Sequence, residues 1–467
     1  VADSCVNWIS NKFKEKENFY IFCGNGNNGG GGFALAKIMY HNGFDITVFL
    51  NENENFSKDA ASNLKKIKQI SGIDIFDFND AATFNFKENA VIIDAVFGTG
   101  LNRRTNKKEI DLITFLNGVK LPKVSIDMPS GLLADQMITD QTVIFKADET
   151  LSFQFWKKTF LHPETGIYCG KVHILDISLS EEFIQDEITS DYVIDDQLIH
   201  RIYKTRSEFS HKGNFGKTTI IAGSFGRVGA AVLAVKAALK SGSGLTFVHA
   251  PKCGYEILQT SCPEAIYLYG GENHHDRFQI DHDTVVGIGP SLGINTDTES
   301  AFMDFLKSCD QPMVLDADAL NIISRHSQFL ARIPENSIIT PHPKEFERLF
   351  GITENSFDRV ELAREKAAEL GIYIVLKDHH TQIITPEKDV FYNITGNSGM
   401  AKGGSGDALL GIITSLLAQN YSSKDAAIFG VWLHGKAGDL AAEKFSKEAM
   451  LPTDLINELG MVFKSLA

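Results

Sequence analysis

The chain has 467 residues, enough for two or three domains. Its net charge of −14 argues against a nucleic-acid-binding protein, which would present a basic surface. We recognise no signal peptide and no apolar run long enough to span a bilayer, so we expect no membrane association. Six scattered cysteines without a Cys-x-x-Cys pair predict reduced thiols and a cytoplasmic protein.

The first part of the chain alternates apolar strands with helical segments. Helices are expected at 1–14 and 32–41, and strands at 19–23, 46–50, 90–95 and 123–127. Buried strands that alternate with helices predict an α/β domain with a doubly wound parallel sheet and helices on both faces.

The α/β pattern restarts after an acidic, weakly periodic stretch at 177–196, which we interpret as a linker. We therefore divide the chain into a domain of residues 1–180 and a larger α/β domain of residues 181–467. In the second domain, strands are expected at 218–222, 284–288, 313–316, 337–340 and 372–376, and helices at 228–241, 356–370 and 408–419.

Glycine-rich Gly24–Gly32 lies between a predicted strand and a predicted helix. Its first residues satisfy Gly-x-Gly-x-x-Gly, and Glu52 or Glu54 could bind a ribose, so a dinucleotide-dependent oxidoreductase is one reading. The asparagine carbonyls in this stretch also suit a hard cation or a ribose-amide ligand. Two further loops, 94–104 and 125–131, follow strands. Since carboxyl ends of parallel strands converge on the ligand crevice, we expect all three loops to share one site.

The strings Gly-Asn-Asn-Gly-Gly, Asp-Ala-x-x-Gly-Thr-Gly and Asp-x-Pro-Ser-Gly resemble the NAD(P)H-hydrate epimerase domain over roughly residues 1–178. That family has a Rossmann-like fold and interconverts the R and S hydrates of NAD(P)H. The resemblance implies a catalytic acid/base at Asp127 and a potassium site formed by Asn28, Asp94 and Ser130. The implied substrate-binding residues are Asn27, Asn28, Gly29, Gly30, Gly31, Gly98, Thr99, Gly100, Leu101, Asn102, Arg103, Arg104 and Asp127.

Two departures from that family stand out. Gly31 occupies a position where the family usually has aspartate, which removes a hydrogen-bond acceptor from the ligand loop. One alternative is therefore an N-terminal half that is a structural or nucleotide-binding module without epimerase activity. The family also has a helical stretch that would precede Val1, so residues before Val1 are expected to be missing from this sequence.

The second domain contains the glycine-rich stretch Gly396–Asp407, which runs into an apolar helix at 408–413. Such a loop favours a bound anion, because backbone N–H groups and the helix dipole point at it. Asp407 lies on this predicted loop, where a carboxylate could accept a proton from an attacking hydroxyl. Four more loops, at 287–293, 316–321, 340–346 and 377–381, follow predicted strands and are expected near the same place.

The strings Gly-Pro-x-Leu-Gly, Asp-Ala-Asp-Ala-Leu, Thr-Pro-His-Pro-x-Glu-Phe and Gly-Asn-x-Gly-Met-Ala-x-Gly-Gly-Ser-Gly-Asp resemble the ADP/ATP-dependent NAD(P)H-hydrate dehydratases from about Arg201 onward. That family has a ribokinase-like fold and takes its phosphate from a nucleotide, with magnesium. The resemblance implies Asp407 as the base. It implies hydrate contacts from Ala230, Gly293, His342 and Asp407, and nucleotide contacts from Lys377, Asp378, His379, His380, Thr381 and Gly406.

Together the two resemblances imply a bifunctional repair enzyme. It would epimerise R- and S-NAD(P)H hydrates and dehydrate the S form with ADP, giving NAD(P)H, AMP and phosphate. ATP is the other possible donor, because bacterial members of the family favour ADP and eukaryotic members favour ATP. A ribokinase-like kinase of a small alcohol is the main alternative for the second domain. We also expect a homo-oligomer.

Overall fold

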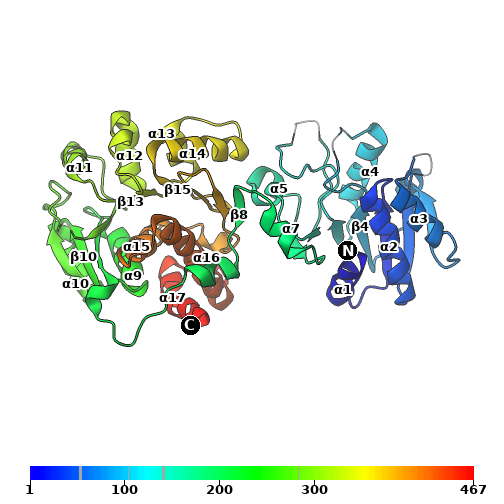
Figure 1. Ribbon diagram of the computed structural model, residues 1–467, viewed down its shortest axis with the longest axis horizontal. Helices are drawn as coiled ribbons and strands as arrows, with labels where there is room; N and C mark the ends of the chain where they lie inside the picture. Colours follow the sequence, from blue (N-terminus) through cyan, green and yellow to red (C-terminus); the bar gives the residue numbers. More distant parts are fainter. Residues whose placement is uncertain (52–54, 102, 104, 139–141, 282) are drawn as a thin grey trace. The chain divides into compact units, whose positions relative to one another are not determined.

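The computed structural model describes residues 1–467 except 52–54, 102, 104, 139–141 and 282 (Figure 1). The chain forms two compact units, each described by itself below. The N-terminal unit comprises Val1–Ile188 with Asn355–Phe357, and the C-terminal unit comprises Thr189–Glu354 with Asp358–Ala467. The change between units thus falls inside the stretch interpreted as a linker, which also holds the short helix α7, Glu181–Asp186.

The N-terminal unit is built on a parallel sheet with the strand order β3-β2-β1-β4-β5-β6-β7. Its strands are β1 Asn18–Cys23, β2 Asp45–Leu50, β3 Asp74–Asp77, β4 Ala90–Ala95, β5 Lys123–Ile126, β6 Glu149–Phe153 and β7 Lys171–Leu175. Its other helices are α1 Ala2–Lys12, α2 Asn27–His41, α3 Lys58–Ile67, α4 Lys107–Gly118, α5 Lys158–Leu161 and α6 Pro163–Gly166. The order 3-2-1-4-5-6 is the Rossmann arrangement, in which ligands bind where the strand order reverses, between β1 and β4.

Both faces of this sheet are buried, as successive residues of β1 show. Phe19, Ile21 and Cys23 belong to an apolar cluster with α1, α2 and α3. Tyr20 and Phe22, which point to the opposite face, belong to a second cluster with α4. The prediction of a doubly wound sheet is therefore confirmed.

Helix α2 begins at Asn27, five residues before the predicted start at Gly32, so most of the glycine-rich stretch is helical. The reason is tertiary packing, which overrides the poor helix propensity of glycine. A Cβ atom on Gly29 would lie 1.8 Å from the carbonyl oxygen of Gly24. Glycine therefore allows the first turn of α2 to lie directly against the end of β1.

The C-terminal unit contains a larger, mixed sheet with the order β11-β10-β9-β12-β13-β14-β15-β16-β17-β8. Neighbouring strands are parallel except that β16 is antiparallel to β15 and to β17. The strands are β8 Asp191–Val193, β9 Lys217–Ile221, β10 Leu245–Ala250, β11 Ile266–Tyr269, β12 Val285–Ile288, β13 Met313–Leu315, β14 Ile338–Ile339, β15 Tyr373–Leu376, β16 Gln382–Ile384 and β17 Val390–Tyr392.

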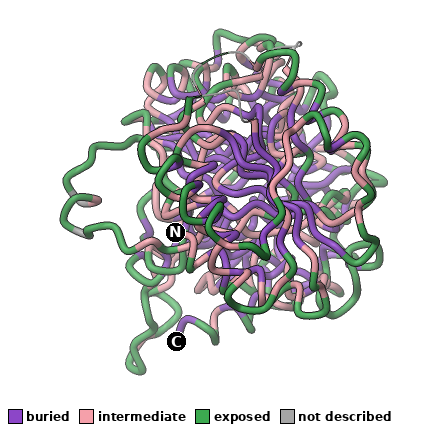
Figure 2. The backbone as a smooth tube through the Cα atoms, turned by 90° about the vertical axis from the view of Figure 1, so that its right-hand side faces the viewer, coloured by how far each residue is buried: buried purple, intermediate pink, exposed green. Residues whose placement is uncertain are grey.

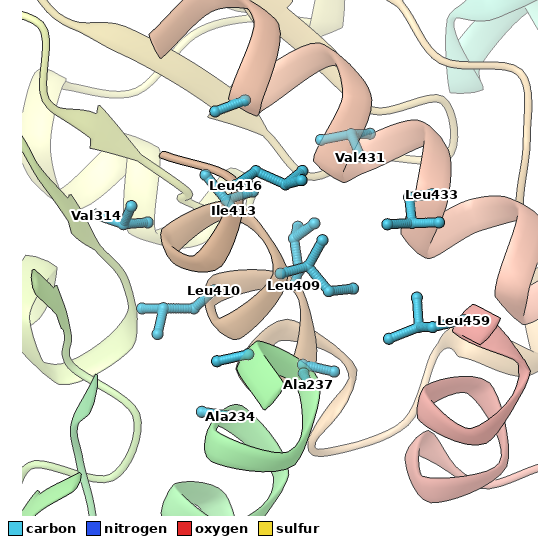
Figure 3. Packing of buried hydrophobic residues seen from close by; sticks show 14 of the residues in the cluster. Ala234, Ala237, Val314, Leu409, Leu410, Ile413, Leu416, Val431, Leu433 and Leu459 are labelled. Atoms are coloured by element: carbon cyan, nitrogen blue, oxygen red, sulfur yellow. The ribbon is translucent and has the colours of Figure 1, made fainter. Parts of the chain in front are cut away.

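One face of this sheet carries a helical layer centred on α15, Ser405–Ala418. The other helices of the C-terminal unit are α8 Asp196–Ile202, α9 Val228–Lys240, α10 Tyr255–Ser261, α11 Thr296–Ser308, α12 Ala317–Arg325, α13 Pro343–Phe350, α14 Ser356–Leu370, α16 Ser423–Ala449 and α17 Pro452–Leu466. Leu409, Leu410 and Ile413 of α15 point toward α9, α16 and the sheet (Figure 3). This apolar packing fixes the start of α15, where the predicted anion site lies.

Burial follows the strands and the core helices. In Figure 2 the buried segments run through the interior of the molecule, and the exposed segments are mainly loops. Among the described residues, no helix has the length and apolar character needed to cross a membrane. All six cysteines are free thiols, as the sequence predicted.

Candidate active sites

In the N-terminal unit, the three predicted loops line one cavity of about 630 Å³ at the carboxyl ends of β1, β4 and β5. Nine of the predicted epimerase residues line it, and they are Asn27, Asn28, Gly31, Gly98, Thr99, Gly100, Leu101, Arg103 and Asp127. The cavity lies where the strand order reverses, as expected for a Rossmann-like sheet.

Asp127 directly follows β5 and has a left-handed backbone with φ of +67°. This conformation is costly for a residue other than glycine and is often retained at functional sites. One carboxylate oxygen, Oδ2, accepts a hydrogen bond from the Thr99 backbone N–H at 2.8 Å. A Cβ atom on Gly98 would lie 2.4 Å from that oxygen, so glycine at 98 leaves the space that the carboxylate occupies.

Of the three residues implied in potassium binding, Asn28 lines the cavity, and the buried Asp94 and Ser130 are connected to it through Phe97. The Ser130 Oγ donates to Asp94 Oδ1 at 2.5 Å, and the Ser130 N–H and the Ser125 hydroxyl both donate to Asp94 Oδ2 at 2.8 Å. Asn28 donates from Nδ2 to the Phe97 carbonyl at 2.8 Å, and the Phe97 N–H donates to Ser130 Oγ at 2.9 Å. Burial raises the pKa of Asp94, although these hydrogen bonds oppose the shift. Carboxylate, hydroxyl and carboxamide oxygens form a donor set that fits a hard cation.

Some predicted epimerase residues are placed differently. Gly29 and Gly30 do not line the cavity, because they pack against Gly24 and Ala60. The Arg103 guanidinium is paired with Glu109 through bonds of 2.6 and 2.9 Å, so this charge is already compensated. Asn102 and Arg104, and the acidic residues Glu52 and Glu54 of the oxidoreductase reading, lie outside the described residues.

In the C-terminal unit, Asp407 lies in the first turn of α15 and not on the preceding loop, which corrects the prediction. The turn into the helix is made by Gly404, with φ of +99°. Burial and the nearby Asp316 carboxylate raise the pKa of Asp407 to about 6, and Lys377 opposes this shift. A carboxylate with such a pKa is a better base than an exposed aspartate and remains mostly ionised at neutral pH.

A chain of charged groups connects Asp407 to the other predicted residues. Lys377 Nζ lies 2.7 Å from Asp316 Oδ1 and 3.9 Å from Glu345 Oε2. His342 Nε2 lies 3.4 Å from Glu345 Oε1, and burial lowers the pKa of His342. A Cβ atom on Gly406 would lie 3.4 Å from both Asp316 Oδ2 and Lys377 Nζ. Lys377 therefore reaches the start of α15, as a phosphate-binding lysine would have to.

Of the predicted hydrate contacts, Gly293 is connected to this network through Asp318. The Gly293 N–H donates to Asp318 Oδ2 at 2.9 Å, and Arg227 Nη1 lies 3.7 Å from the same oxygen. Asp318 also acts on Asp407 electrostatically. Ala230 lies in the first turn of α9, which begins directly after Arg227.

The rest of the predicted nucleotide segment forms the turn between β15 and β16. Asp378 is paired with Arg359 of α14 at 3.1 Å and accepts the His379 N–H at 2.8 Å. His380 Nδ1 lies 3.2 Å from the Asn393 carbonyl oxygen, and burial lowers the pKa of His380 to about 4. The Thr381 carbonyl accepts the Asn393 N–H at 2.9 Å. These contacts fix the turn in place beside Lys377.

Sequence reasoning assigned no role to Asp316, Asp318, Glu345 or His434. The first three follow buried strands, which is the signal that could have identified them. His434 on α16 had no such signal: its Nε2 lies 3.0 Å from the Ser405 carbonyl oxygen at the start of α15, and burial lowers its pKa to about 4. Within the part of the chain that the structure describes, no three His, Cys, Asp or Glu side chains could hold a metal ion together.

Both halves of the chain match known families. Residues 218–460 match the family described as NAD(P)H-hydrate dehydratase, and residues 1–159 match the family described as YjeF-related protein N-terminus. The bifunctional NAD(P)H-hydrate repair enzyme Nnr of Coxiella burnetii is 32% identical over 97% of this chain and 91% of its own length. Nnr of Escherichia coli is 33% identical over 96% of this chain and 86% of its own length.

Two solved structures resemble the C-terminal unit. The ADP/ATP-dependent NAD(P)H-hydrate dehydratase from Bacillus subtilis, co-crystallised with ATP and Mg²⁺, matches with a TM-score of 0.53 and 31% identity, over 59% of this chain and 99% of that chain. A ribokinase-like superfamily protein from Enterococcus faecalis matches with a TM-score of 0.52 and 28% identity, over 60% of this chain and 98% of that chain. The resemblances inferred from the motifs of both halves are thus confirmed, and the chain belongs to the family of bifunctional NAD(P)H-hydrate repair enzymes.

Proposed function

We propose that the C-terminal unit dehydrates the S hydrate of NAD(P)H with ADP, and that the N-terminal unit supplies this epimer from the R hydrate. The observation that carries the proposal is the position of Asp407. Its carboxylate has a pKa of about 6 and lies in the first turn of a helix, beside Gly406 and Lys377. The N–H groups of a first helical turn lack partners within the helix and suit a phosphate.

In the dehydratase reaction, Asp407 takes the proton of the hydrate hydroxyl as its oxygen attacks the terminal phosphorus of ADP. The bond from that phosphorus to the departing AMP oxygen breaks. Lys377 and the start of α15 stabilise the charge on the transferred group. The phosphate group of the new ester then leaves with the electron pair of the C–O bond, while the ring nitrogen donates its lone pair to the ring carbon. Loss of a proton from the neighbouring ring carbon completes NAD(P)H.

In the epimerase reaction, the carbon that bears the hydroxyl must be inverted. That carbon is bonded to the ring nitrogen, so the ring can open at this bond. Asp127 takes the hydroxyl proton, the electron pair of the O–H bond forms a carbonyl, and the electron pair of the C–N bond moves to the nitrogen. Closure of the ring on the opposite face reverses these steps and returns the proton. The cavity of about 630 Å³ offers room for the nicotinamide end of the substrate.

Two ions fit the residues present. Asn28, Asp94 and Ser130 would hold potassium, which would supply positive charge beneath the cavity. Magnesium would come with the nucleotide and neutralise its phosphates, with carboxylates such as Asp316 nearby. Oxygen ligands and phosphates are the partners that both hard cations prefer.

The phosphate donor is tested by recovery of reduced-nicotinamide absorbance from S hydrate and magnesium with either ADP or ATP. We expect the wild-type chain to prefer ADP, and Asp407→Asn to recover no absorbance with either nucleotide. Asp310→Asn, an exposed aspartate of the same unit, is the matched control and should retain the wild-type rate. Faster recovery with ATP than with ADP would show that ATP is the preferred phosphate donor. An active Asp407→Asn chain would refute the assignment of Asp407 as the base.

A further inference from the structure

A partly buried lysine lies beside Asp127. Lys157 follows β6, and its Nζ lies 3.9 Å from Asp127 Oδ1. The lysine side chain is only 13% exposed and the aspartate side chain 15%. None of the epimerase residues predicted from the sequence is a lysine, although Lys157 stands in the segment 150–157 that resembles that family.

The Lys157 ammonium is anchored by three other oxygen atoms. Nζ donates to the Ser152 Oγ at 2.8 Å and to the carbonyls of Phe153 and Phe155 at 3.0 Å each. An ammonium has three N–H donors, so these three bonds use all of them. Lys157 therefore does not donate to Asp127 but acts on it as a positive charge held at a fixed place.

The backbone that presents these carbonyls is itself held in an unusual conformation. Gln154 has a left-handed φ of +57°, and its N–H donates to the Leu175 carbonyl at 2.9 Å. Its side-chain Oε1 accepts the Ile177 N–H at 3.1 Å. A left-handed residue and two hydrogen bonds to the chain around the end of β7 thus hold the turn whose carbonyls accept hydrogen bonds from Lys157.

The other titratable groups that act on this pair are few among the described residues. Burial lowers the pKa of Lys157, while Asp127 and Asp135 favour its charged form. On the α1 side lies Cys5, whose pKa burial raises to about 12, so this thiol carries no charge at neutral pH. Arg103 and Val1 also line the cavity, but the Arg103 guanidinium is paired with Glu109, whereas Lys157 Nζ lies within 4 Å of the Asp127 carboxylate.

We propose that Lys157 is a positioning residue of the epimerase reaction, a fixed cation beside Asp127 that stabilises the negative charge left on the hydrate when Asp127 takes its hydroxyl proton. This inference rests on the proposed role of Asp127 as the base. The anionic species that forms as the hydroxyl is deprotonated thereby has a positive charge close to it.

The test compares Lys157→Met and Lys157→Arg with Lys120→Met, an exposed lysine of the same unit. Conversion of R hydrate with ADP and magnesium is measured under conditions in which epimerisation limits the rate. We expect Lys157→Met to lose about tenfold or more of its epimerisation rate above the spontaneous rate. Lys157→Arg keeps the positive charge beside Asp127 and should restore most of that rate.

The second activity of the chain reports whether the variants are folded, because S-hydrate dehydration should be unchanged in all of them. If Lys157→Met unfolds, Ser152→Ala provides the milder change: it removes one anchor of the ammonium and should also lower the epimerisation rate. A wild-type epimerisation rate in Lys157→Met or, failing that, in Ser152→Ala would overturn the inference. An active Asp127→Asn chain would refute the base itself, whereas an inactive Asp127→Asn beside a wild-type-like Lys157→Met would refute only the role of the lysine.

Discussion

The raised pKa of Asp407 predicts how dehydration depends on pH. Burial and Asp316 raise this pKa to about 6, and the reaction needs the ionised carboxylate. Activity should therefore be complete above that value and fall as pH drops through it. From pH 7 to pH 5 the ionised fraction of a group with this pKa falls from about 90% to about 10%, so kcat/KM should fall about tenfold.

Asp316→Asn tests the cause of the shift. The substitution keeps the size of the side chain but removes the negative charge that favours protonated Asp407. It also leaves Lys377 without its partner at 2.7 Å, and an uncompensated ammonium favours ionised Asp407 further. Both effects have the same sign, so the acid limb should move to lower pH by about one unit.

The assay is the initial rate of absorbance recovery with limiting S hydrate and saturating nucleotide, from pH 4.5 to 8.5. S hydrate avoids any contribution from epimerisation, and Asp310→Asn serves as the control for a change in net charge. A wild-type limb near pH 4 would show that Asp407 behaves as an ordinary aspartate. A limb that moves to higher pH in Asp316→Asn would contradict the electrostatic argument.

Three glycines give further predictions. Gly98→Ala should abolish epimerisation above the spontaneous rate and spare dehydration, because its Cβ would lie 2.4 Å from Asp127 Oδ2. Gly31→Asp should raise the kcat/KM of epimerisation, since Gly31 lines the cavity and its Cβ would point into open space. Gly411→Ala should lower the free energy of unfolding of the C-terminal unit by about 1–3 kcal/mol, measured by denaturant titration, because its Cβ would lie 2.1 Å from a backbone carbonyl of α9.

Each of these substitutions has a matched control or a contrary outcome. Gly118→Ala, at the end of α4, has a Cβ that meets nothing within 4 Å and should leave epimerisation intact, so equal losses in Gly98→Ala and Gly118→Ala would contradict the displacement of Asp127. An unchanged epimerase in Gly31→Asp would show that this carboxylate is dispensable here. Gly460→Ala also meets nothing within 4 Å, so a loss of stability as large as that of Gly411→Ala would argue against the steric cause.

The parts of the fold that the sequence predicted are those with long apolar runs. β1 and β4 are six residues each and buried on both faces, so they stand out from their surroundings. The three-residue strands β8, β16 and β17 carry no periodicity and are defined only by their neighbours in the sheet. The early start of α2 was missed because close packing of Gly29 against Gly24, and not local propensity, decides it.

The location of both sites was predictable because glycine and acidic residues follow strands, and such strand ends converge. The pairings within the sites were not. Lys377 and Asp316 are 61 residues apart in the chain, and no local pattern indicates that their side chains meet. The same holds for Lys157 and Asp127, which come from the ends of neighbouring strands. The homo-oligomer expected from the sequence stays a prediction, which sedimentation would test.

The most direct test of two cooperating sites is an equal mixture of R and S hydrates with ADP and magnesium, followed by reduced-nicotinamide absorbance. We predict that the wild-type chain recovers the full absorbance faster than spontaneous epimerisation allows. Asp127→Asn should recover only the S half at the fast rate, and Asp407→Asn should recover nothing. Full, fast recovery by Asp127→Asn, or no recovery by the wild-type chain with either ADP or ATP, would contradict the account.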